Sequence, residues 1–282
     1  MTNHTKQPST FNNQNPLSTN TQGAGGDSVD TSAVVGAKVS ALPKRLHAMP
    51  PTPAHLPESM IQSVKYLPNS NERMLLFTRH SLRERSNGQG FASYDLPLTP
   101  KGRVLAKSWG QWLGNHLSYS LDTQSIASPI GRCVNTAQLM QEGAGVDQPI
   151  THEPLLVEPG SLVTNPFKAN MVFKQIGALN FINAFLKDEL DSTKPARQGG
   201  LDLLSLLYDS QPDPGHLALA VSHDTLLAAF LGVMRQAGII SWDDWPKMME
   251  GMFVWFDDKP FEESTANFIW RGEHFQVATN TL

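Results

Sequence analysis

The 282-residue sequence has a single cysteine, Cys133, so a disulfide bond within the chain is excluded. Charged residues make up only 17% of it and the net charge at pH 7 is -4, so the overall balance does not favour nucleic acid. Long apolar runs are also missing: the best candidate for a membrane span, residues 33–42, is too short and contains Lys38. The first residues lack the basic segment and apolar core of a signal peptide. These absences predict a cytoplasmic protein with no membrane or nucleic-acid partner.

The N-terminal part of the sequence differs in composition from the rest. Residues 1–32 are rich in Asn, Thr, Gln, Ser and Gly and contain almost no large apolar side chains. Such a segment buries too little apolar surface to offset the entropy of ordering. Residues 43–57 then contain five prolines, a composition typical of an extended strap or linker. We therefore predict a disordered, proline-rich segment over residues 1–57 and one folded domain over residues 58–282.

Short apolar runs and helical patterns alternate in the second part of the sequence. The expected strands are residues 74–77, 125–128, 217–222, 252–256 and 266–270. A helix over residues 98–116 begins with Thr99 at the N-cap and Pro100 at the first helical position. Further helices are expected over residues 129–140, 169–187, 201–208 and 224–237. This alternation predicts an α/β fold with a largely parallel central sheet.

Three of the expected strand ends carry cationic or imidazole side chains. Arg79, His80 and Arg83 follow the first strand, Arg132 follows the second, and His223 follows the strand over 217–222. The ligand crevice of an open α/β sheet lies at the carboxyl ends of its strands. We therefore expect these five side chains to meet in one pocket.

Arginines and histidines together suit the transfer of a phosphoryl group. A guanidinium group matches the oxygens of a phosphate, and a neutral imidazole can attack phosphorus to form a phosphohistidine. A carboxylic acid must then protonate the leaving oxygen. Asp224, which directly follows His223, is the preferred candidate, and Glu158 is the alternative.

Four segments of this sequence, in order, resemble the motifs of the histidine phosphatase superfamily. TRHSLRER (78–85) resembles the family's RHG signature, LTPKGRVLA (98–106) its LTxxG helix start, SPIGRCVNTA (128–137) its SPxxRxxxTA segment, and SHDTLLAAFLG (222–232) the HD motif of its acid-phosphatase branch. The resemblance implies a phosphoglycerate mutase-like domain over residues 58–282, with helices on both faces of the sheet. It also implies a phosphohistidine intermediate and neither a metal ion nor another cofactor. Ser81 departs from the pattern, because the family usually has glycine at this position.

The resemblance assigns a role to each candidate residue. His80 would be the nucleophile, and the phosphate-binding residues would be Arg79, Arg83, Arg132 and His223. Asp224 matches the proton donor of the acid-phosphatase branch, whereas Glu158 matches the glutamate used by mutase-like branches.

The leading hypothesis from the sequence is a hydrolase of small phosphorylated substrates. The alternatives are a phosphotransferase of the phosphoglycerate mutase type and a catalytically silent phosphate-binding module. We expect specificity to lie in residues 159–215, although nothing there names the substrate, and the sequence does not indicate the oligomeric state. The tryptophan-containing stretch 241–256 is expected to serve packing more than substrate binding.

Overall fold

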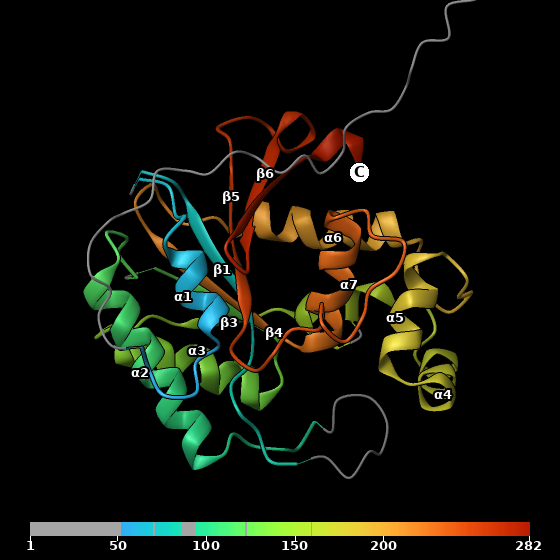
Figure 1. Ribbon diagram of the computed structural model, residues 1–282, viewed down its shortest axis with the longest axis horizontal. Coiled ribbons are helices and arrows are strands. Elements are labelled where there is room, and N and C mark those ends of the chain that lie inside the picture. The colour runs from blue at the N-terminus through green and yellow to red at the C-terminus, as the bar shows by residue number, and fades with distance from the viewer. Residues whose placement is uncertain (1–51, 70, 86–93, 122, 159) are drawn as a thin grey trace, which may run out of the picture. The chain divides into compact units, whose positions relative to one another are not determined.

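A mixed sheet of seven strands forms the centre of the fold, in the order β3-β2-β4-β1-β5-β6-β7 (Figure 1). The computed structural model describes residues 52–282 except 70, 86–93, 122 and 159, and all of these lie in one compact unit, Val34–Leu282. Most of the segment 1–57 that we predicted to be disordered lies outside the described residues. The first described helix begins at Glu58.

The strands are β1 Met74–Arg79, β2 Ser125–Ala127, β3 Ile150–His152, β4 Leu217–Ser222, β5 Gly251–Phe256, β6 Thr265–Trp270 and β7 Glu273–Ala278. The α-helices are α1 Glu58–Val64, α2 Pro100–His116, α3 Gly131–Gly143, α4 Pro166–Ile176, α5 Ala178–Leu186, α6 Ala196–Asp209 and α7 Asp224–Met234. None of these helices is long and apolar enough to cross a membrane, as far as the chain is described.

The sheet has a parallel half and an antiparallel half. Strand β4 pairs in parallel with β1 and β2, and β2 pairs in parallel with β3. Strands β5, β6 and β7 extend the other edge as antiparallel neighbours. A tight turn joins β6 to β7, and its two residues, Arg271 and Gly272, have φ angles of 50° and 78°, as a two-residue hairpin requires. The α/β prediction is confirmed, with a sheet that is parallel only from β3 to β1.

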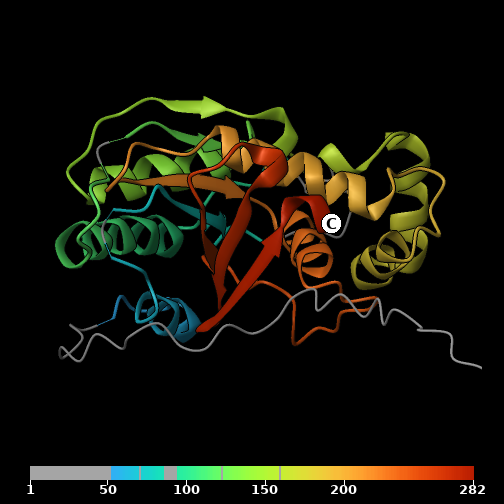
Figure 2. The same cartoon turned by 90° about the horizontal axis from the view of Figure 1, so that it is seen from above.

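Each face of the sheet is covered by its own group of helices (Figures 1 and 2). Successive side chains of a strand point to opposite faces. Leu75 and Phe77 of β1 therefore join an apolar core with residues of α5, α6 and α7. Met74 and Leu76 join a second core with residues of α1, α2 and α3. The helices predicted on both faces are confirmed.

Helix α2 begins as the sequence predicts. The Thr99 Oγ1 atom accepts a hydrogen bond of 3.0 Å from the amide of Gly102, and Pro100 is the first helical residue. A Cβ atom on Gly102 would lie 2.1 Å from the carbonyl oxygen of Leu82, so the motif needs glycine where the helix touches the segment after β1. Val104, in the first turns of this helix, faces the solvent. This side chain is 67% exposed, because its neighbour Leu105 takes the inward position.

The single helix predicted over residues 169–187 is two helices. Gly177 separates α4 from α5 and has a φ of 79°, which a right-handed helix does not allow. The apolar side chains of this segment therefore belong to two short helices, α4 and α5. Phe181, Ile182 and Phe185 of α5 are buried against the sheet, whereas Phe167 and Met171 of α4 are exposed.

Candidate functional site

The carboxyl ends of β1 and β4 bring two histidines together. These strands are parallel neighbours, and Arg79 of β1 lies opposite Ser222 of β4. His80 and His223 are the next residues of each strand's chain, so their rings lie side by side with centroids 5.5 Å apart. Arg132 reaches both rings from the first turn of α3.

His80 is buried and held at both ring nitrogens. Its side chain is 1% exposed. The Nε2 atom lies 3.0 Å from Nε of Arg132, and because a guanidinium group only donates, Nε2 must accept. The proton is therefore on Nδ1, which donates to the carbonyl oxygen of Ser81 at 2.8 Å. Burial lowers the pKa of His80 well below its ordinary value, helped by His223, Arg79 and Arg132. The imidazole is neutral, with its lone pair directed at a cation.

His223 is neutral for the same reasons. Its Nδ1 atom accepts a hydrogen bond of 3.1 Å from Nη2 of Arg132. Its Nε2 atom therefore donates to Oγ of Ser128, 3.0 Å away. Burial, with a further contribution from Arg132, lowers the pKa of His223 to about 3.

Ser81, which replaces the usual glycine, directs its hydroxyl group away from the histidines. The Oγ atom donates to the carbonyl oxygen of Gly102 in α2 at 2.8 Å. The amide of Ser81 donates to Oγ1 of Thr136 in α3 at 3.0 Å. The serine thus ties the loop after β1 to α2 and α3.

Arg79 and Arg83 each keep a buried Nε donor without a partner. Arg79 uses Nη2 in an ion pair of 2.6 Å with Asp224 and Nη1 in a hydrogen bond of 2.8 Å to the carbonyl oxygen of Pro246. Arg83 donates from Nη1 to the carbonyl oxygen of Glu84 at 2.9 Å. Within the described part of the chain, the Nε atoms of both arginines are buried and find no acceptor. Buried donors of this kind are rare in proteins unless a ligand or solvent meets them.

The two candidate acids lie in different surroundings. Burial alone would raise the pKa of Asp224, but the charge of Arg79 and the indole N–H of Trp245 outweigh it, so the pKa is lowered. The pKa of Glu158 is raised to about 7, mainly by burial and then by the nearby negative charge of Asp224. The hydrogen bond from Thr225 lowers this pKa, but by less. Oε2 of Glu158 lies 3.8 Å from Nδ1 of His223. At neutral pH, Asp224 is an anion and Glu158 is partly protonated.

The sequence analysis missed several residues that support this cluster. Thr225 donates its hydroxyl group to Oε1 of Glu158, and it directly follows the His-Asp pair in the sequence. The Tyr94 hydroxyl group donates to the carbonyl oxygen of Glu158 at 3.0 Å. Trp245 donates to Oδ2 of Asp224 at 3.1 Å, although the stretch around it was expected to serve packing. Only the position of Thr225 beside the motif was a usable signal.

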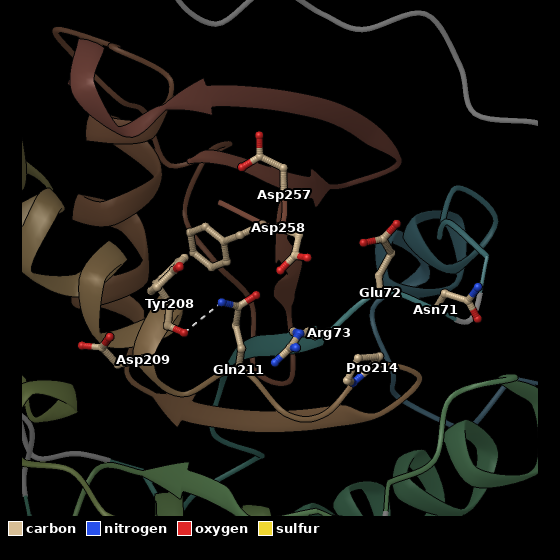
Figure 3. Close-up of a pocket in the computed structure, with 10 residues that line it drawn as sticks. Asn71, Glu72, Arg73, Tyr208, Asp209, Gln211, Pro214, Asp257 and Asp258 are labelled. Atoms are coloured by element: carbon tan, nitrogen blue, oxygen red, sulfur yellow. Dashed lines mark hydrogen bonds between the residues drawn. The ribbon is translucent and has the colours of Figure 1, made fainter. Parts of the chain in front are cut away.

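A separate cavity of about 480 Å³ lies at the other end of β1 (Figure 3). Figure 3 shows Arg73, which directly precedes β1, between Gln211 and Glu72. Asp209, Asp257 and Asp258 also line it, so its charged lining residues are acidic except for Arg73. His80 follows the opposite end of the same strand, so this cavity is not part of the histidine site.

A metal site would need several His, Cys, Asp or Glu side chains close together within the described residues. No group of three or more His, Cys, Asp or Glu side chains there is arranged to hold a metal ion.

Comparison with known proteins agrees with the motifs. The model of the histidine phosphatase superfamily (branch 1) matches residues 75–162. No match was found among curated proteins. Two solved structures, mycobacterial hydrolase 1 and mycobacterial hydrolase 2, share 16% and 15% identity with this chain, each with a TM-score of 0.50. The first comparison covers 71% of this chain and 99% of the other, and the second covers 74% and 94%.

At this level of identity, the two mycobacterial hydrolases show a shared fold and nothing more. The superfamily match contains the segments around His80 and Arg132, which the fold joins to His223. The match to the histidine phosphatase superfamily therefore covers residues 75–162 of this chain, and the two mycobacterial hydrolases share its fold.

Proposed function

We propose that this protein hydrolyses phosphomonoesters through a phosphohistidine on His80. The observation that supports this most strongly is the state of His80: a neutral ring with a proton on Nδ1 and an Nε2 lone pair facing Arg132. A phosphate bound beside this pair would replace their direct contact, so that Nε2 of His80 meets phosphorus and the guanidinium group of Arg132 meets a phosphate oxygen. The unpartnered Nε atoms of Arg79 and Arg83 supply further donors for its oxygens.

The first step forms one bond and breaks one. Nε2 of His80 attacks phosphorus while the bond from phosphorus to the leaving oxygen breaks. The leaving oxygen takes the proton of the acid, and Nδ1 keeps its proton for the carbonyl group of Ser81. In the second step, water attacks phosphorus, the phosphorus–nitrogen bond breaks, and the water proton returns to the acid. The products are an alcohol or phenol and inorganic phosphate.

We propose Glu158 as the acid in place of Asp224, the candidate that the sequence favoured. A general acid works best when its pKa is near the working pH. The pKa of Glu158 is raised to about 7. The carboxylate of Asp224 is already bound by Arg79 and Trp245 and its pKa is lowered. Asp224 then positions the arginine without transferring a proton.

Two leaving groups separate the roles of the two carboxyl groups. An alkyl phosphate needs protonation of its leaving oxygen, whereas a nitrophenyl phosphate hardly does. We expect Glu158→Gln to lower kcat/KM for the alkyl ester on the order of 10²–10⁴-fold and to affect the aryl ester much less. Asp224→Asn is expected to lower kcat/KM for both esters alike, because Arg79 loses its ion pair. Glu142→Gln, at an exposed glutamate of α3, is the matched control.

If Asp224→Asn lost activity selectively on the alkyl ester and Glu158→Gln had little effect, the role of proton donor would return to Asp224. Loss of activity on both esters in both variants would instead indicate that the two carboxyl groups act together.

The pH profile provides an independent check on the acid. Because only protonated Glu158 is active in the first step, kcat/KM for the alkyl ester should fall as the pH rises through about 7. His80 does not limit this range, since its pKa is lowered well below its ordinary value and the ring stays neutral. The alkaline fall should disappear in Glu158→Gln and persist in Glu142→Gln. An unchanged profile in Glu158→Gln would contradict the assignment.

A further inference from the structure

The segment between α7 and β5 presents two tryptophans next to the site. We call residues 241–250 the tryptophan loop; it contains Trp242 and Trp245. The loop is held from two sides. Arg271, in the turn between β6 and β7, donates to the carbonyl oxygens of Asp243 and Trp245 and pairs with Glu250 at 2.9 Å. Arg79 donates to the carbonyl oxygen of Pro246 at 2.8 Å. These contacts fix the loop backbone beside the carboxyl end of β1.

The indole group of Trp245 is bonded into the phosphate-binding cluster. Its Nε1 atom donates to Oδ2 of Asp224, the same oxygen that pairs with Nη2 of Arg79. One carboxylate oxygen therefore joins the indole ring to an arginine proposed to hold the phosphate. The ring also packs against the apolar core, and this hydrogen bond ties it to the site.

Trp242 extends this aromatic surface outward. Its ring centroid lies 5.0 Å from that of Trp245, with an angle of 56° between the rings, and its side chain is 62% exposed. So exposed a tryptophan contributes little to the core, and it leaves a large apolar surface in water that a ligand can cover. The two rings run from a buried carboxylate to the solvent.

The charges of the loop limit what can lie on this surface. Asp243 is exposed, and Asp244 pairs with Arg235 at 3.2 Å. Carboxylates next to the tryptophans disfavour a leaving group that carries its own negative charge. A neutral, flat group satisfies both the apolar rings and the acidic surroundings.

We infer that Trp242 and Trp245 form an aromatic wall for the leaving group, and that the substrates are phosphomonoesters of a neutral aromatic alcohol or phenol. This inference rests on the proposed phosphatase function and names its substrate class. It places specificity in the tryptophan loop, whereas the sequence analysis expected it in residues 159–215. The ring of the substrate stacks on the wall while its phosphate is bound by His80 and Arg132.

Binding of stable phosphonates tests the wall without requiring turnover. Phenylphosphonate and methylphosphonate differ only in the ring, and both can be titrated calorimetrically against the full chain. We expect the wild-type protein to prefer phenylphosphonate on the order of tenfold, the size of one or two aromatic contacts. In Trp242→Leu this preference should fall to about twofold or less, while the affinity for methylphosphonate stays within about twofold.

Two further variants complete the experiment. Ile239→Ala removes another exposed apolar side chain just before the loop, and the preference should remain. Trp245→Leu should reduce the preference and also weaken the binding of methylphosphonate, because Asp224, the ion-pair partner of Arg79, loses the hydrogen bond from the indole group. Equal affinity for the two phosphonates in the wild type, or an unchanged preference in Trp242→Leu, would overturn the inference.

The failure of the wall and the failure of the phosphatase are distinguishable. A protein that hydrolyses esters but binds both phosphonates equally is a phosphatase without an aromatic wall. A protein that hydrolyses no phosphate ester, yet prefers phenylphosphonate in a way that depends on Trp242, has the wall but a different function.

Discussion

Replacing His80 with alanine is expected to abolish turnover. The proposed nucleophile is the Nε2 atom of this neutral ring, whose lone pair is directed at Arg132. Loss of a covalent nucleophile costs at least on the order of 10⁴-fold in kcat. The measurement is steady-state hydrolysis of a nitrophenyl phosphate by the purified variant, with a thermal melt to show that it is folded.

Two companion proteins make the His80 result interpretable. His152→Ala changes an exposed histidine of β3 and should leave activity unchanged. His80→Asn keeps a side-chain amide near the carbonyl group of Ser81, so it should fold and remain inactive. Labelling with a phosphorus-32 substrate and an acid-free quench should trap phosphohistidine in the wild type alone. Substantial hydrolysis by a folded His80→Ala protein would contradict the assignment.

Replacing Arg132 with lysine is expected to lower kcat/KM by on the order of 10²–10³-fold, as for the loss of one preorganised donor. The guanidinium group contacts both histidines, through Nε to His80 and through Nη2 to His223. Lysine retains the charge but loses the planar pair of donors. It therefore cannot occupy the same two positions or hold two phosphate oxygens at once. Hydrolysis of an aryl phosphate, which hardly depends on the acid, measures this effect directly.

The matched control is Arg103→Lys, at an exposed arginine of α2. It should behave like the wild type in both activity and melting. Near-normal activity in Arg132→Lys would show that charge alone suffices, and the proposed two-donor contact would then be wrong.

The position of the site followed from local patterns. His80 and His223 each end a buried apolar run, and parallel strands place such ends at the same edge of a sheet. Thr99 and Pro100 defined the start of α2 because a capping hydroxyl group and a fixed proline φ act within one turn. These features depend on neighbours in sequence, so they can be read without coordinates.

Other features had weaker local signals. β3 has only three residues, too few for an alternating pattern to be distinguished from a loop. β7 forms because Arg271 and Gly272 adopt positive φ angles that fold the chain back on β6. The break between α4 and α5 depends on the φ angle of Gly177, which the apolar spacing around it does not reveal.

The sequence by itself determined the α/β class, the resemblance to the histidine phosphatase superfamily and which histidines and arginines meet at the carboxyl ends of the parallel strands, because short apolar runs and helix caps act locally. Only the tertiary structure decided how the two carboxyl groups differ. Glu158 is buried beside Thr225, whereas Asp224 is bound by Arg79 and Trp245, residues far from it in the chain. A pKa depends on the burial and charges around a group in space. Long-range contacts therefore separate the candidate acid from the positioning carboxylate and bring the two tryptophans to the site.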